Sequence, residues 1–269
     1  MMCTVRIVVD NQTRRGLAVE HGFTVLLDSH GEQLLLDTGA GAALMDNLAS
    51  LGVELGSIKR LVLSHGHWDH TGGLAELLAA LPDLPVFAAP GVLQERFSCH
   101  PERPVRDVSM PAECRRAYAA ARVHELTGFT PICPGIFATG PIPRLSGEDC
   151  GGPFYLDAAK EQPDPLVDDQ SLLLAAGVLI PGCCHSGIIN TLEHCRRCAP
   201  GVKIHTIIGG LHLVHADQER LERTAAYLQQ LGLRRLVACH CTGEEAIAWL
   251  RDRLSCEVLT GASGDLYEY

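Results

Sequence analysis

Four side chains that can bind a metal ion occur within six consecutive residues of the chain. They are His65, His67, Asp69 and His70, in the stretch Leu61–Leu74. Three imidazoles and one carboxylate suit Zn, Mn or Fe. Because side chains alternate along an extended segment, His65 and His67 are expected to project the same way, and Asp69 and His70 follow where the chain turns. One segment can therefore serve two adjacent metal ions, and packing alone is a poor explanation of the cluster.

The sequence around this cluster alternates between strand and helix patterns. Ile58–Ser64 has the pattern of a buried strand, and Gly73–Leu81 has the pattern of a helix. Strands are further expected at Thr4–Asp10, Thr24–Leu27, Gln33–Leu36, Val86–Ala89, Ser171–Ile180, Val202–Gly209 and Arg235–His240, and helices at Gly41–Leu51, His185–Cys198, Gln218–Leu231 and Gly243–Leu254. This order predicts mixed sheets with helices outside them, in two halves that could stack as a four-layer αββα sandwich.

A weaker pattern separates the two halves. Ten of the 15 prolines fall between Pro101 and Pro165. We interpret residues 94–165 as an insertion or lid region over one face, because irregular segments of this length in a compact domain are usually lids or disordered. No Gly/Ser linker divides the chain, so residues 1–269 are expected to form a single domain.

Composition narrows the classes of function. The 269 residues carry a formal charge of −10, from 22 Lys+Arg against 32 Asp+Glu, which argues against a nucleic-acid binder. The absence of an uncharged apolar run of ~18 residues argues against a membrane partner. The start has no export-signal pattern, so we expect a cytoplasmic protein whose 12 cysteines are thiols rather than a disulfide framework. The oligomeric state is left open.

Two stretches resemble a known superfamily. His65–His70, which reads HGHWDH, resembles the H-x-H-x-D-H signature of the metallo-β-lactamase superfamily. Leu34–Gly39 is similar to that fold's early strand, which ends in Asp-x-Gly. The resemblance implies the four-layer αββα sandwich. A closer resemblance, to the branch of ribofuranosylaminobenzene phosphate synthase-like, dihydropterin-related proteins, rests on Val9–Asn11, Glu20–Gly22, Leu63–His67, Asp168–Leu172, Gly182–Asn190, Gly209–Leu213 and His240–Gly243.

The resemblance also implies roles for individual residues. The superfamily pattern has six ligands in two groups, which here are His65, His67 and His185 for one metal ion and Asp69, His70 and His240 for a second. Asp69 would also orient the nucleophile. Asp37 would orient the histidine segment without touching a metal. Asp168 and Asp169 could do the same or belong to a solvated turn.

The chain departs from the superfamily at the bridging ligand. The usual aspartate, in a Gly-Asp turn after a late strand, is absent, and Cys183 and Cys184 follow Gly182 instead. A thiolate is a good zinc ligand, so either cysteine could bridge two ions. Without a bridge the second ion would be weak or absent. His212 could act in the active site, as a metal ligand, a catalytic group or a substrate contact, or it could belong to the core.

The other cysteines carry weaker signals. Cys195 and Cys198 form a C-x-x-C motif, which is a candidate metal or redox site, but no second pair at zinc-ribbon spacing accompanies it. Ordinary surface or core cysteines are the better interpretation. Cys239 and Cys241 flank His240 and would point away from it if the strand continued, so we expect them to be packing residues.

A metal site of this kind activates water, which predicts a metal-dependent hydrolase, with one or two zinc ions, of a small phosphorylated or pterin-like molecule. Arg144 and Arg103, together with Arg106, are candidates to hold a phosphate, against the alternative of solvated charges. The branch name implies a synthase-like transferase instead. Two further alternatives are an iron-dependent oxidoreductase and a non-catalytic ligand-binding protein with a degraded metal site. Superfamily oxygen reductases usually have Glu where this chain has His67, which favours zinc hydrolysis over the first of these, and the absent bridging aspartate motivates the second.

Overall fold

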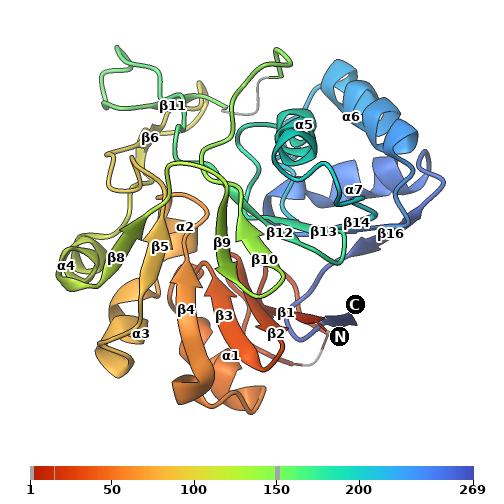
Figure 1. The fold of residues 1–269 in the computed structure, drawn as a ribbon. Coiled ribbons are helices and arrows are strands. Elements are labelled where there is room, and N and C mark those ends of the chain that lie inside the picture. The colour runs from red at the N-terminus through yellow and green to blue at the C-terminus, as the bar shows by residue number, and fades with distance from the viewer. Residues whose placement is uncertain (1–2, 15, 149–151) are drawn as a thin grey trace.

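The computed structural model describes residues 3–14, 16–148 and 152–269. Two seven-stranded sheets lie face to face, and helices cover the outer face of each (Figure 1). The first sheet has the order β17-β1-β2-β3-β4-β5-β8, and the second has the order β16-β15-β14-β13-β12-β10-β9. Both sheets mix parallel and antiparallel pairs. This is the four-layer αββα sandwich that the sequence predicts.

The first sheet comes mainly from the N-terminal half. Its strands are β1 (Cys3–Val9), β2 (Thr24–Ser29), β3 (Glu32–Leu36), β4 (Ile58–Val62), β5 (Val86–Ala88), β8 (Val123–Glu125) and β17 (Leu266–Glu268). The 3₁₀ turn η1 (Leu55–Ser57) leads into β4. The helices on its outer face are α1 (Leu44–Ser50), α3 (Leu74–Ala80) and α4 (Ala112–Ala120).

The second sheet comes mainly from the C-terminal half. Its strands are β9 (Thr130–Cys133), β10 (Ile136–Ala138), β12 (Ser171–Leu174), β13 (Val178–Pro181), β14 (Thr206–Gly209), β15 (Arg235–Ala238) and β16 (Glu257–Thr260). The helices on its outer face are α5 (Ile188–Cys198), α6 (Gln218–Leu231) and α7 (Glu244–Arg251).

The strands are apolar on both faces because both faces are covered. In β13, Val178 and Ile180 point into the core between the sheets, whereas Leu179 packs on the helical side. In β1, Ile7 belongs to the core between the sheets and Val8 packs against the α1 side. Burial on both faces explains why these strands read as nearly continuous apolar runs.

The stretch Ser171–Ile180 was wrongly predicted to be one strand. It forms the antiparallel pair β12 and β13, in which Leu174 lies opposite Val178. The turn between them contains Gly177 at φ 86°, a conformation that glycine adopts without steric cost. Since both strands are buried on both faces, periodicity gave no sign of the turn.

Residues 94–165 contribute more regular structure than a loop would. They supply the edge strand β8 of the first sheet and the strands β9 and β10 of the second. They also form a small three-stranded sheet of β6 (Phe97–Ser98), β7 (Arg106–Asp107) and β11 (Phe154–Tyr155). That this region acts as a lid stays a prediction.

Several expected elements are shorter than the sequence suggested, and two of the differences concern histidines of the site. β15 ends at Ala238, and His240 begins the 3₁₀ turn η2 (His240–Thr242) with φ 45°. The helix expected from His185 begins at Ile188. Both histidines therefore lie in turns that follow strands. Among the described helices, none is long and apolar enough to span a membrane.

Candidate metal centre

The histidine cluster follows β4 and is anchored by Asp37, which lies directly after the neighbouring strand β3. One Asp37 carboxylate oxygen accepts the Ser64 N–H at 2.6 Å, and the other accepts the Ser64 hydroxyl at 2.6 Å and lies 2.7 Å from His70 Nδ1. The Ser64 hydroxyl gives its one hydrogen to Asp37, so it accepts from His65 Nδ1 at 2.9 Å. With Nδ1 of both rings engaged in this way, Nε2 of His65 and of His70 is the atom left to face a metal ion.

One group of ligand atoms contains only imidazoles. Nitrogens of His65, His67 and His185 lie within 4.8 Å of one another, and all three residues are buried. His65 Nε2 and His67 Nδ1 are 3.1 Å apart. Burial lowers the pKa of each ring well below its ordinary value. Neutral imidazole is the form that binds metal.

A second group of ligand atoms surrounds the Asp69 carboxylate, which the short helix α2 (Trp68–Thr71) presents. Asp69 Oδ2 lies 3.3 Å from His240 Nε2 and 3.2 Å from His21 Nε2. These two imidazoles hold the pKa of Asp69 well below its usual range, although burial opposes this. His240 Nδ1 contacts Asn11 Oδ1 at 2.8 Å, which leaves Nε2 facing Asp69.

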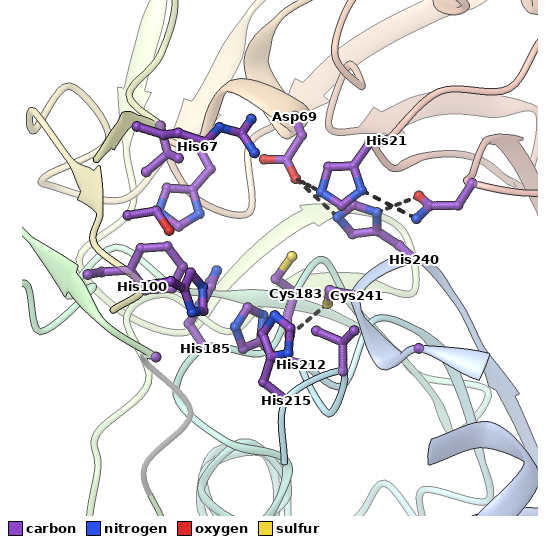
Figure 2. Close-up of a pocket in the computed structure, with 18 of the residues that line it drawn as sticks. His21, His67, Asp69, His100, Cys183, His185, His212, His215, His240 and Cys241 are labelled. Carbon is purple, nitrogen blue, oxygen red and sulfur yellow. Dashed lines mark hydrogen bonds and ion pairs between the residues drawn. The ribbon is translucent and has the colours of Figure 1, made fainter. Parts of the chain in front are cut away.

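Cys183 lies between the two groups, as Figure 2 shows. Its Sγ is 3.1 Å from His70 Nε2. The Cys183 thiol belongs to three groups of ligand atoms within 4.8 Å, one with His65 and His70, one with His240 and Cys241, and one with His185 and a further histidine. The thiol therefore occupies the position between the two ligand groups.

Cys184 points the other way. It adopts φ 62°, packs in the core beneath α5 and contacts the Thr191 hydroxyl at 3.4 Å. Of the two cysteines that the sequence left open as bridging ligands, the structure therefore places only Cys183 at the centre.

Cys241 also reaches the site, and its prediction as a packing residue is wrong. The prediction assumed that β15 continues through His240, whereas the chain turns after Ala238. The pKa of Cys241 is lowered because contacts with the Cys183 thiol and with His212 outweigh its burial. Cys239, by contrast, packs in the core between the sheets.

His185 and His212 lie side by side, with ring centroids 4.3 Å apart. His212 lies in the loop after β14 at φ 48°, and its ring nitrogen joins Cys183 and His185 in one group of ligand atoms. This places His212 in the site and not in the core. The Asp169 carboxylate accepts the Ser186 N–H at 2.7 Å and thereby fixes the turn that carries His185.

Arg96, in the region that carried little sequence signal, connects this region to the histidine segment. It is fully buried, and its guanidinium contacts both carboxylate oxygens of Asp168 at 2.6 and 2.9 Å. The same carboxylate accepts the Gly66 N–H at 2.8 Å, between His65 and His67. Asp168 and Asp169 are therefore buried anchors, and the alternative of a solvated turn is wrong.

A pocket of about 700 Å³ opens over these groups. Trp68 and Phe154 form part of its wall, and the Phe154 ring lies 4.9 Å from that of His67. Arg103 and Arg106 line the same pocket. Arg144 does not line this pocket but a smaller neighbouring cavity of about 280 Å³, which does not support its candidacy as a substrate contact of this site.

The C-x-x-C motif lies elsewhere. Cys195 is buried beneath α5, whereas Cys198 is exposed and lies 3.7 Å from a nitrogen of His194. Within the described parts of the chain, neither thiol belongs to a group of three ligand atoms. The structure thus favours ordinary cysteines here.

Sequence reasoning missed three residues of the site. His21 was part of a short stretch that carried the resemblance but received no role. No local sequence pattern indicated a role for Arg96, because its partners Asp164 and Asp168 are distant in sequence. Cys241 was misplaced because the end of β15 was.

The donor set fits divalent metal ions. His67 Nε2 and both nitrogens of His185 are buried and have no hydrogen-bond partner within the described residues. Such orphaned atoms are costly unless an ion or water satisfies them. Imidazole, carboxylate and thiol donors together suit zinc, and two ions could share Cys183.

Comparisons with known proteins agree with this geometry. Residues 17–141 match the family model of the metallo-β-lactamase superfamily. A similar protein is 7,8-dihydropterin-6-methyl-4-(β-D-ribofuranosyl)-aminobenzene-5'-phosphate synthase of Methanocaldococcus jannaschii. The two sequences are 29% identical over 248 residues, which cover 84% of this chain and 82% of the relative. It is 26% identical to a solved metal-dependent hydrolase of the β-lactamase superfamily, with a TM-score of 0.86 and 99% of each chain covered. The chain shares its fold with a diphosphatase from the PhnP family. The two are 13% identical, with a TM-score of 0.59, and the match covers 100% of this chain and 98% of the diphosphatase.

Proposed function

We propose that this chain is a member of the metallo-β-lactamase superfamily and acts as a zinc-dependent hydrolase of a small phosphorylated or pterin-like molecule. The observation that carries the proposal is the position of the Cys183 thiol beneath one pocket, within 4.8 Å of ligand atoms of His65 and His185 on one side and of His240 on the other. Zinc bound there would polarise a carbonyl or phosphoryl oxygen and lower the pKa of water to about 7. The similarity to the metallo-β-lactamase superfamily supports an enzymatic function, and the hydrolytic reaction is what we add to it.

Some residues of the site would bind the metal ion, and others would orient the attacking water. His65, His67 and His185 would hold one ion as neutral imidazoles. Asp69 remains ionised in the site, so it can accept a hydrogen bond from the attacking water and orient it. His21, at 3.2 Å from Asp69 and partly exposed, fixes that carboxylate from the mouth of the pocket.

Phe154 and His212 would control access of water and substrate to the metal centre. The Phe154 ring lies against His67, His185 and His212 and would limit the access of bulk water. His212 has a buried Nδ1 without a hydrogen-bond partner among the described residues, so it is available to a ligand or to the substrate.

A synthase-like transferase is the second candidate. It is favoured by the name of the archaeal relative, which describes the synthase of a compound that contains a dihydropterin and a ribofuranosyl-aminobenzene phosphate. The same pocket and ligand set would serve either reaction, because fold and metal site alone do not fix the reaction class.

An assay of ester hydrolysis distinguishes the hydrolase from the transferase. Zinc-loaded protein would be assayed on a panel of phosphomonoesters, phosphodiesters and thioesters, beside His67→Asn and the matched control His30→Asn, whose residue is exposed and remote from the pocket. We expect hydrolysis of at least one class, a loss of roughly a hundredfold or more in His67→Asn, and little change in His30→Asn. Absence of turnover on every class by the zinc-loaded protein would refute the hydrolase proposal and shift weight to the transferase.

A further inference from the structure

The pocket above the metal centre is lined by acidic and by cationic residues. Its acidic residues are engaged by the protein: Asp10 accepts the His240 N–H at 3.0 Å, Glu244 accepts the Gln12 side-chain amide at 2.7 Å, and Asp69 lies 3.2 Å from His21 Nε2. Its arginines come from other elements: Arg103 and Arg106 belong to the segment that contains β7, and Arg220 belongs to the first turn of α6, where its guanidinium donates to the His212 carbonyl at 2.6 Å. The acidic and cationic residues of the pocket therefore come from different elements.

We propose that His100, Arg103, Arg106 and His215 form a subsite for the phosphate group of a phosphomonoester. For the position of the reacting bond, this proposal rests on the hydrolase function proposed above. All four residues line the pocket together with His185 and the other candidate ligands. In the view of Figure 2, His100 and His215 lie on the opposite side of the pocket from Asp69 and His21. Hereafter these four residues are called the cationic wall.

Among the described residues, the two arginines of this wall have no acidic partner. Within the parts of the chain that the structure describes, the Arg103 guanidinium makes no hydrogen bond or ion pair, although the backbone N–H of Arg103 is bound to the His100 carbonyl. Arg106 places its guanidinium carbon 5.9 Å above the centre of the Trp68 ring and makes no ion pair with a described acid. On a chain with a net charge of −10, two arginines without acidic partners in one pocket point to an anionic ligand.

The groups of the wall also repel one another. The rings of His100 and His215 have centroids 5.0 Å apart. The pKa of His100 is lowered, first by burial and then by the positive charges of His215 and Arg103. A bound dianion would remove this repulsion, whereas a neutral ligand would leave it in place.

The number of donors favours phosphate over carboxylate. Two guanidiniums and two imidazoles offer more N–H groups than the two oxygens of a carboxylate can accept, whereas a phosphomonoester has three terminal oxygens and close to two negative charges. Beside the wall, Trp68 contacts both Arg106 and His21, and Phe154 contacts His67. These aromatic rings would cover the organic part of the molecule between the wall and the metal centre.

Calorimetric titration of the metal-loaded protein with benzylphosphonate tests the subsite. This probe carries a dianion and a ring, and it cannot be hydrolysed at its C–P bond. Benzyl alcohol serves as the neutral comparison. Arg103→Met and the double variant Arg103→Met/Arg106→Met would be compared with Arg122→Met, which removes an exposed arginine outside the pocket.

We expect benzylphosphonate affinity to fall roughly tenfold in Arg103→Met and further in the double variant, with metal content and Tm unchanged. Benzyl alcohol binding and the Arg122→Met variant should show no such loss. Equal binding by the double variant and wild type would overturn the proposal, as would an equal loss in Arg122→Met. Loss of phosphonate binding in His67→Asn but not in the double variant would also overturn it, because the metal centre would then be the anion site.

The outcomes for the subsite and for the hydrolase proposal can be told apart. Specific phosphonate binding at the cationic wall without turnover on any ester would refute the hydrolase function and leave the subsite standing. Turnover of uncharged thioesters with phosphonate binding insensitive to Arg103 and Arg106 would refute the subsite and leave the hydrolase standing.

Discussion

Replacement of Asp37 by asparagine should weaken both the fold and the metal site, although Asp37 touches no metal position. Asparagine keeps one acceptor oxygen for the Ser64 N–H but presents an amide to the Ser64 hydroxyl and to His70 Nδ1, which Asp37 now contacts at 2.6 and 2.7 Å. Two hydrogen bonds to a buried charge are therefore lost, and donors face each other. Hydrogen bonds to charged groups contribute about 1.5–3 kcal/mol each, so the loss of two is expected to lower the free energy of unfolding by about 3–6 kcal/mol.

The effect on metal binding follows from the same contacts. Asp37 fixes His70 and, through Ser64, His65, and the loss of such an orienting carboxylate typically costs roughly 10–100-fold in metal affinity. Urea unfolding of metal-stripped protein and zinc competition with a chromophoric chelator would measure the two quantities. Asp83→Asn, at an exposed turn, is the matched control and should stay within about 0.5 kcal/mol of wild type. A variant Asp37→Asn that binds zinc as wild type does and loses less than about 1 kcal/mol would refute the reasoning.

Three further perturbations test other contacts of the site. Arg96→Met should destabilise the protein by about 3–5 kcal/mol in urea unfolding, because it leaves the buried Asp168 charge unpaired; a loss below 1 kcal/mol would count against this role. Gly66→Ala should lower zinc affinity in chelator competition, because an added Cβ would overlap the Val92 carbonyl oxygen and displace the histidine segment; unchanged affinity would show that the segment can relax. Cys241→Ser should retain the fold and lower the affinity for the soft ion Cd²⁺ more than for Mn²⁺; equal effects on both would indicate that Cys241 packs against the site without contributing as a ligand.

The fold could be predicted from the sequence because several signals agreed. Apolar strands alternated with amphipathic helices, and the HGHWDH stretch sat between Ile58–Ser64 and Gly73–Leu81, where β4 and α3 occur. The errors concern turns. The sharp turn at Gly177 left no mark because residues on both sides of it are apolar, and β8, β9 and β10 are too short, at three to four residues, to show a period.

The site was predictable where ligands are close in sequence or follow strands. His65–His70 needed only local spacing, and His185 and His240 came from the resemblance and their places after strands. Arg96 and His21 could not be assigned, since their roles depend on contacts with Asp168 and Asp69, 72 and 48 residues away, which no local pattern encodes. The orientations of Cys183 and Cys184 depend on one backbone angle, φ 62° at Cys184.

The metal content of the purified protein, measured by elemental mass spectrometry beside Cys183→Ala, tests most directly whether two ions share this thiol. The position of the Cys183 thiol, within 4.8 Å of ligand atoms of His65 and His185 on one side and of His240 on the other, predicts two zinc ions per wild-type chain and fewer than two in the variant, with the fold intact by circular dichroism. Two ions in both proteins would contradict the bridging role of Cys183. A single ion or none in folded wild-type protein after zinc loading would contradict the two-ion centre itself, and iron in place of zinc would contradict the assignment as a zinc hydrolase.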